Sequence, residues 1–467
     1  MSQLLIKHMK LPPLVVPEEL VSPIAAIAAA GGTPWFVGGA VRDHLLGLEP
    51  KDYDVETFGL GMDEIAKALA PFGHVDIIGE AFGVVKLFIN HKDYDFSVPR
   101  TEVKSGEGHQ GFTVVPDPFL SLEAAAMRRD FTCNTIYFNP ITEEYADPCD
   151  GAWDLNNGIL RHASKAFSED PLRVLRAFQF CSRFGFIVDP ETVDICRSLK
   201  GEFHSLSKER VWMEWEKWAT KSKAPELGLE FLRKCGWVEH FPGIRHIMHI
   251  RQEPTHHPEG DVWVHTVECL KAIRRLEEPV PQEEKLVTTL AVLCHDLGKI
   301  VCTQDDGNRI TSHGHEAAGE TIAMDFLKSI NAPREISNQV VKLVGNHMLR
   351  CGDIGPKVVR RAAQRVFPAT LQQLCWVMEA DTRGRPPKPD VCCAKVRLIR
   401  DFARAQSLEK APPVPIIKGR NLIDIGMQPS AEFGKILAFA MEGQLDGKFG
   451  NLSTGIIYLR ENSIIPQ

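Results

Sequence analysis

The sequence predicts an α/β head, a mixed sheet with helices, followed by mostly α-helical domains, and three observations favour this fold class. Short apolar runs of strand character alternate with helical segments over residues 1–150. Beyond Arg210 the pattern is helical, and Trp212, Trp215 and Trp218 recur at a spacing that we expect to form core. Hydrophobic content of 44% and charged content of 25% are ordinary for globular proteins, so neither a fibrous nor a disordered chain is expected.

Length, charge and cysteine content narrow the classes of protein further. A chain of 467 residues is expected to form about three domains at ~150 residues each. A formal net charge of −7 argues against a general nucleic-acid binder, so an RNA partner would need a local basic face. Twelve irregularly spaced cysteines, including adjacent Cys392 and Cys393, fit neither a disulfide scaffold nor a Cys-x-x-Cys zinc site, and we expect reduced thiols. No apolar run approaches ~18 residues, and Lys7, Lys10 and Pro12 interrupt the N-terminal segment, so we expect no membrane partner and a cytoplasmic location.

The strongest chemical pattern in the head is a glycine turn followed by paired aspartates. An apolar run ends at Gly38 and Gly39 and is followed by Arg42, which predicts a strand turning tightly into a helix whose first amides face phosphate. The next strand is predicted to carry Asp52 and Asp54 on one face, because side chains alternate along a strand. Since Mg²⁺ binds carboxylates together with substrate phosphates, the two halves together predict a nucleotidyl-transfer site. Either half alone would also fit a surface β-turn with solvated acids.

A hairpin is predicted after this pair. Residues 82–89 and 94–98 are β-rich, and the polar step at 90–93 is typical of a turn. Asp95 on the second strand is a candidate third carboxylate of the same site, although the sequence leaves the register of that strand open. Residues 100–118 are polar and contain glycines, so we expect a mobile loop that substrate can order.

The next polar segment is a candidate for binding the sugar and phosphates of a nucleotide. Arg129 can clamp triphosphate oxygens with its planar guanidinium. Asp130 and Asn134 are short enough to form hydrogen bonds with ribose hydroxyls. The alternative is a capped helix start that leaves a basic pair exposed.

A third segment is a candidate for recognising a base. Asp170, Arg173 and Arg176 follow one another at intervals of three, so a helix would carry them on one face. An aspartate and an arginine held side by side offer acceptors and donors that can read the Watson–Crick edge of a base without a template. The alternative is an i,i+3 ion pair on a solvated helix, worth only ~0.3 kcal/mol.

A second group of titratable residues lies in the helical part of the chain. It contains the adjacent His295 and Asp296, with His265 before them and Asp381 after them. Imidazoles and carboxylates from several helices can bind a transition metal or Mg²⁺, and water on that metal can attack phosphate. Further histidines, at looser spacing, are His313, His315 and His347. Each histidine taken alone would also fit a packing residue with its hydrogen bonds satisfied.

The order of the head motifs resembles that of the bacterial class II tRNA nucleotidyltransferase and poly(A) polymerase superfamily. The motifs that carry this resemblance are Gly38-Gly39-x-Val41-Arg42-Asp43, Asp52-x-Asp54, Arg128-Arg129-Asp130-Phe131-Thr132-x-Asn134, Glu169-Asp170-x-x-Arg173-x-x-Arg176 and Glu209-Arg210-Val211-Trp212. The resemblance implies that Asp52 and Asp54 are catalytic and hold Mg²⁺. The nucleotide-binding residues that it implies are Gly39 and Arg42 at the triphosphate, Arg129 and Asp130 at triphosphate and ribose, Asp170 and Arg173 at the base of CTP or ATP, and Arg176 as a support.

The histidine group resembles the HD phosphohydrolase family. Its signature here is Cys294-His295-Asp296-Leu297-Gly298-Lys299, with His265 preceding it. The resemblance implies a second divalent metal, of unknown identity, whose ligands include His265, His295, Asp296 and Asp381, with His313, His315 and His347 as less regular members. Together with the head motifs it resembles the multifunctional CCA-adding proteins, in which such a domain removes phosphates from nucleotide or RNA ends.

These resemblances imply a division of the chain and a reaction. We expect a nucleotidyltransferase head at 1–150, a nucleotide-selecting helical neck at 151–245, an HD domain at 246–390 and a helical tail that contacts tRNA at 391–467. The expected reaction is addition of C, C and A from CTP and ATP to the 3′ end of tRNA, with Mg²⁺ as cofactor. Three alternatives stay open: a poly(A) polymerase, an enzyme that adds only CC or only A, and a metal phosphohydrolase whose head only binds tRNA.

Overall fold

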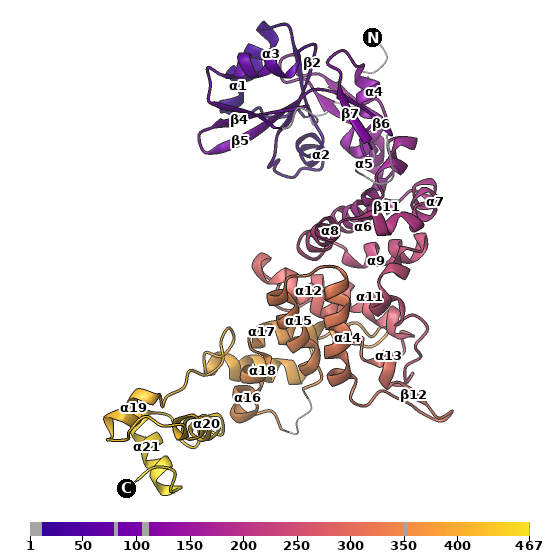
Figure 1. Cartoon of the computed structure of the whole chain (residues 1–467). Helices are drawn as coiled ribbons and strands as arrows, with labels where there is room; N and C mark the ends of the chain where they lie inside the picture. The colour runs from indigo at the N-terminus through magenta and orange to yellow at the C-terminus, as the bar shows by residue number, and fades with distance from the viewer. Residues whose placement is uncertain (1–11, 79–82, 105–111, 350–352, 467) are drawn as a thin grey trace. The chain divides into compact units, whose positions relative to one another are not determined.

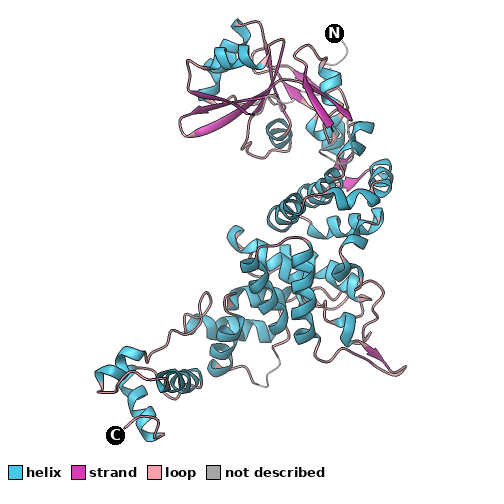
Figure 2. Cartoon of the chain, viewed as in Figure 1, coloured by secondary structure: helices cyan, strands magenta, loops and turns pink. Residues whose placement is uncertain are grey.

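A computed structural model describes residues 12–78, 83–104, 112–349 and 353–466 of the chain (Figure 1). The chain divides into two compact units, Met1–His240 and Phe241–Gln467. Strands are concentrated in the first unit and helices make up most of the second (Figure 2). This distribution confirms the predicted fold class of a mixed-sheet head followed by mostly helical domains.

The head is built on a seven-stranded sheet with the strand order β3-β4-β5-β2-β1-β8-β9. Strands β2 and β5 run parallel, and the other neighbouring pairs are antiparallel. The strands are β1 (Thr33–Val37), β2 (Asp54–Phe58), β3 (His74–Ile78), β4 (Val84–Ile89), β5 (Lys92–Ser97), β8 (Tyr137–Phe138) and β9 (Tyr145–Ala146). Its accompanying helices are α1 (Glu18–Ala29), α2 (Gly39–Leu45), α3 (Met62–Leu69), α4 (Leu122–Ala126) and α5 (Gly151–Asn157).

The register of the central strands decides which acidic residues meet. Val37 pairs with Asp54 across β1 and β2, and Val55 pairs with Phe96 across β2 and β5. Asp54 therefore lies beside Gly38 on one side and Asp95 on the other. The predicted hairpin between β4 and β5 is confirmed, with Asn90 and His91 at its turn, both at positive φ.

The prediction of a loop at 100–118 is wrong for the residues of this range that the structure describes. Strands β6 (Arg100–Lys104) and β7 (Phe112–Pro116) pair antiparallel there. Both segments contain threonine and valine, whose branched side chains favour strands, and this signal outweighs the polarity of the stretch. Residues 105–111 lie outside the described residues.

Helices follow the head within the first unit. They are α6 (Leu172–Phe184), α7 (Pro190–Ser198), α8 (Lys208–Lys221) and α9 (Pro225–Cys235), with short parallel strands β10 (Ile159–Leu160) and β11 (Ile187–Val188). Trp215 and Trp218 are fully buried on α8, and both pack against Phe178 of α6, with ring centroids 4.7 Å and 5.4 Å away. The expected tryptophan core is confirmed for these two residues, whereas Trp212 is only half-buried.

The second unit is a helical assembly with a small hairpin. Its helices are α10 (Pro242–Arg245), α11 (Val262–Ala272), α12 (Lys285–Cys294), α13 (Lys299–Cys302), α14 (His315–Ser329), α15 (Arg334–Asn346), α16 (Pro356–Val366), α17 (Leu371–Arg383), α18 (Ala394–Ala405), α19 (Gly419–Asp424), α20 (Glu432–Leu445) and α21 (Leu452–Glu461). Strands β12 (Gln304–Asp305) and β13 (Ile310–Thr311) form the hairpin. Helices α19 to α21 have a core of their own, which includes Leu422 and Leu459. Among the described residues, no helix combines the length and apolar character needed to cross a membrane.

Candidate functional site

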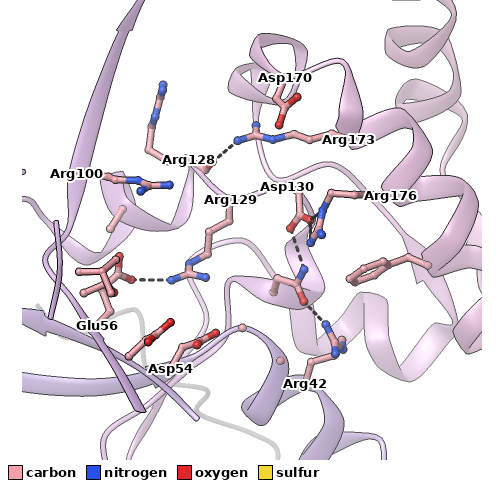
Figure 3. A pocket seen from close by; sticks show the side chains of 18 of the residues that line it. Arg42, Asp54, Glu56, Arg100, Arg128, Arg129, Asp130, Asp170, Arg173 and Arg176 are labelled. Atoms are coloured by element: carbon pink, nitrogen blue, oxygen red, sulfur yellow. Dashed lines mark hydrogen bonds and ion pairs between the residues drawn. The ribbon is translucent and has the colours of Figure 1, made fainter. Parts of the chain in front are cut away.

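A polar cavity of about 570 Å³ opens in the first unit, and its walls come from both the sheet and the helices that follow (Figure 3). Its lining contains nine cationic side chains: Arg42, Arg100, Arg128, Arg129, Arg173, Arg176, Arg183, Lys217 and Lys221. It also contains five carboxylates: Asp54, Glu56, Asp95, Asp130 and Asp170. Such a lining suits a polyanion, and the carboxylates offer oxygen ligands for a divalent cation.

Asp54 lies at the first position of β2 and opens into the cavity. Loss of surrounding solvent is the main cause that raises the pKa of Asp54 to about 6, and the nearby carboxylates of Asp95, Asp52 and Glu56 add to it against Arg129. A divalent cation would neutralise this crowding, and carboxylate oxygens are the ligands that Mg²⁺ prefers. The acidic group therefore fits Mg²⁺.

Asp52 differs from its predicted position. The strand begins at Asp54, so Asp52 precedes it in the connecting segment, is exposed, and is absent from the described cavity lining. Pairing starts late because Gly38 leaves β1 with a φ of 79°, directly after the Val37–Asp54 pair. On β2 it is Glu56, two residues after Asp54, that shares the cavity with it.

Glu56 fixes the direction of Arg129. Its Oε2 accepts hydrogen bonds from Arg129 Nη2 at 3.0 Å and from the Tyr137 hydroxyl at 2.9 Å. Burial would lower the pKa of Arg129, but Glu56 and Tyr137 together outweigh it and raise the pKa, so the guanidinium stays charged. In Figure 3 this guanidinium points toward Glu56 and Asp54. A Cβ at Gly38 would meet Arg129 Nη1 at an ordinary contact distance of 3.4 Å, so it is the positive φ of 79° that favours glycine here.

A chain of hydrogen bonds connects the glycine turn to α6. Arg42 Nη1 donates to Asn134 Oδ1 at 2.7 Å, and Asn134 Nδ2 donates to Asp130 Oδ1 at 2.8 Å. Arg176 Nη2 then lies 2.6 Å from Asp130 Oδ2. Burial would raise the pKa of Asp130, but Arg176 and Asn134 outweigh it and hold the pKa at about 2. Four of the predicted nucleotide-binding residues are thus brought together, each orienting the next.

Asp170 is not on the helix that was predicted to carry it. Helix α6 begins at Leu172, and Asp170 Oδ1 accepts from the Leu172 amide at 3.0 Å. Proline at position 171 disfavours helical backbone in the residue before it, which explains the late start. Asp170 Oδ2 pairs with Arg210 at 2.8 Å. Asp170 and Arg173 still share the cavity wall, although they do not form the i,i+3 pair of a single helix.

Arg173 is anchored by backbone oxygens. Its Nη1 donates to the Ala166 carbonyl at 2.7 Å and its Nη2 to the Arg128 carbonyl at 2.8 Å. Arg128 itself forms an ion pair with Glu169 at 2.6 Å. These contacts hold the segments before α6 and after α4 against each other.

Sequence reasoning missed part of the basic wall. Lys217 and Lys221 stand four residues apart on α8 and line the cavity with Arg183 of α6. Burial, followed by the positive charges of Arg183 and Lys217, lowers the pKa of Lys221. The spacing of the two lysines, four residues apart on one helix, is visible in the sequence. It was missed because the tryptophans of the same helix were interpreted as core residues.

The second unit gathers the predicted histidine group from five helices. His265 lies on α11, His295 and Asp296 follow α12, His315 begins α14, His347 follows α15, and Asp381 lies on α17. Three imidazoles direct Nδ1 at backbone carbonyls: His295 at Val292 (2.8 Å), His315 at Ser312 (2.7 Å) and His347 at Val344 (2.7 Å). A ring held in this way presents Nε2 as the metal-binding atom.

The Nε2 atoms converge around Asp296, which has one oxygen on each side. Asp296 Oδ2 lies 3.3 Å from His295 and 3.6 Å from His265, while Oδ1 lies 3.3 Å from His315 and 3.8 Å from His347. Asp381 completes the first side, 3.1 Å from His265 Nε2. This donor set fits a divalent metal. His313 is exposed and belongs to neither group among the described residues, although it lines the neighbouring pocket.

The pKa values of two histidines on opposite sides of Asp296 are shifted in opposite directions. Burial would lower the pKa of His295, but Asp296 and Cys269 together outweigh it and raise the pKa to about 10. Burial and the charge of His295 lower the pKa of His347 to about 4. Because a metal ligand must be deprotonated, metal binding here is expected to displace protons.

A pocket of about 330 Å³ reaches this centre from outside, and Asp296, His315 and Asp381 contribute to its wall. Two cations hold these carboxylates: Lys299 Nζ lies 2.7 Å from Asp296 Oδ2, and Arg385 Nη2 lies 2.5 Å from Asp381 Oδ1. Both cations and Arg309, between β12 and β13, also line the pocket. The opening is therefore suited to an anion such as phosphate.

Three protein-family models match the chain. They are the poly A polymerase head domain over residues 34–161, the probable RNA and SrmB-binding site of polymerase A over 185–248, and the HD domain over 262–381. The match over residues 34–161 places the head of the chain in the poly A polymerase head family. As a member of this family it is a nucleotidyltransferase that also carries an HD domain.

Solved structures of CCA-adding enzymes share the fold of this chain. The enzyme from Bacillus stearothermophilus in complex with CTP is 21% identical, with a TM-score of 0.64 over 96% of this chain and 99% of its own. The Thermotoga maritima enzyme complexed with tRNA is 18% identical, with a TM-score of 0.59 over 96% of each chain. A CCA-adding enzyme with ATP is 16% identical, with a TM-score of 0.59 over 97% of this chain and 96% of its own.

Proposed function

We propose that this chain adds C, C and A to the 3′ ends of tRNA, using CTP and ATP. The observation that carries this proposal is the single cavity in which the Asp54 carboxylate faces a basic wall and the Asp170–Arg173 pair. A triphosphate needs the basic wall, a metal needs the carboxylates, and a choice of base needs paired donors and acceptors. The solved relatives bound to CTP, ATP and tRNA support this choice of ligands.

The reaction is attack of the RNA 3′-hydroxyl on the α-phosphate, with pyrophosphate leaving in line. Asp52 and Asp54 are the proposed ligands of Mg²⁺, with Asp95 beside Asp54 on the neighbouring strand. Mg²⁺ at these carboxylates supplies charge neutralisation for the phosphate oxygens. Arg129 and Arg42 hold the triphosphate, since Glu56 and Asn134 keep their guanidinium groups at the cavity wall.

Selection of the base is assigned to Asp170 and Arg173. The bases of CTP and ATP both carry an exocyclic amine next to a ring nitrogen. An aspartate can accept a hydrogen bond from the amine, and an arginine can donate one to the ring nitrogen. Arg210 and the Leu172 amide fix the Asp170 carboxylate, and two carbonyls fix Arg173. Asp130, Asn134 and Arg176 support the ribose and the nucleotide beside them.

Labelled-nucleotide addition tests this function. Transcripts of one tRNA that end before, within and after CCA are incubated with each nucleotide singly and with CTP and ATP together. Stepwise addition that stops after CCA is expected. Long A tails would instead assign a poly(A) polymerase, CC-only or A-only products a partial enzyme, and no addition with retained tRNA binding a head that serves only for RNA binding.

We further propose that the HD domain is a metal-dependent phosphatase or phosphodiesterase. His265, His295, Asp296 and Asp381 are its proposed metal ligands, with His315 and His347 on the other side of Asp296. A divalent ion there supplies Lewis-acid activation of a phosphate ester and of the attacking water. Lys299, Arg309 and Arg385 bind the substrate's phosphate anion in the adjoining pocket. Hydrolysis of a panel of phosphomonoesters, phosphodiesters and RNA ends, with each of several divalent metals, tests this activity.

The four-domain division stays a proposal, with the helical tail at 391–467 as a contact for tRNA. Two observations support the tail as a firmly held module. Within it, helices α19 to α21 have their own core, and Arg361 of α16 holds Asp446, directly after α20, at 2.7 Å. Weaker binding of tRNA, without loss of CTP binding, is expected when its exposed basic residues Arg420 and Lys435 are replaced by alanine.

A further inference from the structure

A buried cysteine lies inside the histidine centre. Cys269 is on α11, one helical turn after His265, and its residue is fully buried. Its Sγ lies 3.4 Å from His265 Nε2, the same atom that faces His295 at 3.3 Å and Asp381 at 3.1 Å. The donor atoms of these four residues all lie within 4.8 Å of one another.

These separations match those between ligands of one metal ion. Zinc binds nitrogen and oxygen at about 2.0–2.1 Å and thiolate sulfur at about 2.3 Å, which places tetrahedral ligands roughly 3.3 Å apart for two nitrogens and roughly 3.6 Å for nitrogen and sulfur. The His265–His295 and His265–Cys269 distances follow this order. We propose that Cys269 supplies a thiolate ligand to the metal of the HD domain, together with His265, His295 and Asp381.

The surrounding structure positions the sulfur for this role. The backbone of Gly384, directly after α17, packs onto Cys269 so closely that any side chain at Gly384 would collide with the sulfur. The Gly384 carbonyl also lies 3.1 Å from His265 Nδ1. One backbone segment therefore holds both the imidazole and the thiol in place.

A second buried cysteine serves as a comparison, because we do not assign a metal to its cluster. Cys392 also lies within reach of two carboxylates, Glu277 and Glu379. There Arg400 lies 2.6 Å from Glu379 and 3.5 Å from Glu277, so a protein cation already balances the acids. Around Cys269, Arg385 likewise pairs with the acid, Asp381, but the group also contains the imidazoles of His265 and His295, which offer nitrogen ligands that the Cys392 group lacks.

A thiolate ligand has a consequence for the choice of metal. Soft sulfur donors favour zinc, cobalt and similar transition metals, whereas Mg²⁺ prefers oxygen ligands throughout. The HD centre is thus assigned a borderline transition metal, while the acidic group around Asp54 takes Mg²⁺. This inference rests on the proposed metal-binding function of the HD domain and adds its sulfur ligand.

X-ray absorption of the wild-type full-length chain, loaded with one equivalent of Zn²⁺, tests the ligand directly. One sulfur scatterer at about 2.3 Å from zinc is expected, beside nitrogen and oxygen. A shell of nitrogen and oxygen alone would overturn the proposal while leaving a metal-binding HD domain intact. Failure to bind one equivalent of zinc would reject the proposed metal site itself, and the sulfur ligand with it.

Cobalt spectroscopy of variants gives a second readout. The wild type with one equivalent of Co²⁺ should show a near-ultraviolet thiolate-to-metal charge-transfer band, and Cys269→Ala should lose it while still binding cobalt. Cys375→Ala is the matched control, because Cys375 is equally buried in the same unit and belongs to no metal group among the described residues. Zinc affinity should fall roughly tenfold or more in Cys269→Ala only. A band that survives in Cys269→Ala, or disappears in Cys375→Ala, contradicts the assignment.

Discussion

The cavity of the first unit and the histidine centre of the second use opposite ways of preparing a site. In the cavity, protein groups of opposite charge orient the cations: Glu56 holds Arg129, and Asp130 holds Arg176. In the centre, imidazole nitrogens face one another, with His315 and His347 Nε2 atoms only 3.2 Å apart. Like donors brought this close require a proton or a metal ion between them.

The difference shows how each site would respond to loss of its ligand. The cavity is balanced by its own ion pairs, so its walls are expected to keep their geometry before a nucleotide arrives. The histidine centre also has ion pairs, Lys299–Asp296 and Arg385–Asp381, but its facing imidazole nitrogens are expected to need a metal ion or protons, so its geometry is linked to both. Variants that separate the two sites therefore test both assignments, and the expected effects below run from the largest to the smallest.

Asp54→Ala should have the largest effect, because it removes the carboxylate that opens into the cavity at the start of β2. Nucleotide addition is expected to fall by at least ~1,000-fold, while phosphate hydrolysis by the HD domain is unchanged. The measurement is single-turnover addition to a truncated tRNA. Asp63→Ala, an exposed acid in the first turn of α3, is the control. Retention of more than a few per cent of addition would remove Asp54 from the catalytic group.

His295→Ala should reduce hydrolysis by about 100-fold or more and lower metal content, since it removes a nitrogen that faces both His265 and Asp296. Nucleotide addition should persist, because the two sites lie in separate units. Metal content by mass spectrometry and both activities are measured on the same preparations. His313→Ala is the matched control, which should keep its metal. Loss of both activities in His295→Ala, with an unchanged circular dichroism spectrum, would contradict independent sites.

Arg173→Ala should alter the choice of nucleotide more than the binding of triphosphate. Removal of one charged partner costs ~1–3 kcal/mol for the correct base, which is about 5–150-fold in kcat/KM for CTP and ATP. The kcat/KM for UTP and GTP should fall much less, because their bases present no such amine in that position. The measurement is kcat/KM for all four nucleotides on one truncated tRNA. A uniform decrease would mean that Arg173 only supports the backbone carbonyls of Ala166 and Arg128.

Arg210→Ala should have the smallest effect, and it should change the choice of nucleotide in the same direction as Arg173→Ala. Arg210 holds only one oxygen of Asp170, and the other oxygen keeps its hydrogen bond from Leu172. Discrimination against UTP and GTP is expected to weaken by about 3–10-fold, since one orienting contact contributes roughly 1 kcal/mol. The control is Arg197→Ala, whose exposed pair with Asp194 lies outside the described cavity lining. Equal loss in the control would show a general effect on the helices.

Local patterns in the sequence predicted much of both sites. A glycine turn after an apolar run, acids at neighbouring positions and the adjacent His295 and Asp296 are all visible within a few residues. The structure brings His265, His315, His347 and Asp381 to that pair, and it joins Arg42, Arg129 and Asp130 in one cavity. His313 is the predicted member that stays outside the centre among the described residues. These patterns succeed because strand and helix periodicity depends on nearby residues.

What the sequence determined by itself is the fold class, the order of the motifs and the chemical type of each site. Tertiary structure alone decided that Asp95 and Glu56 share the cavity with Asp54, because strand register depends on pairing between distant segments. It also decided that Arg210 of α8 holds Asp170, and that Cys269 faces the histidines, through the approach of Gly384. In each case the deciding contact joins residues that are far apart in the sequence, so the periodicity of a single strand or helix does not reveal it.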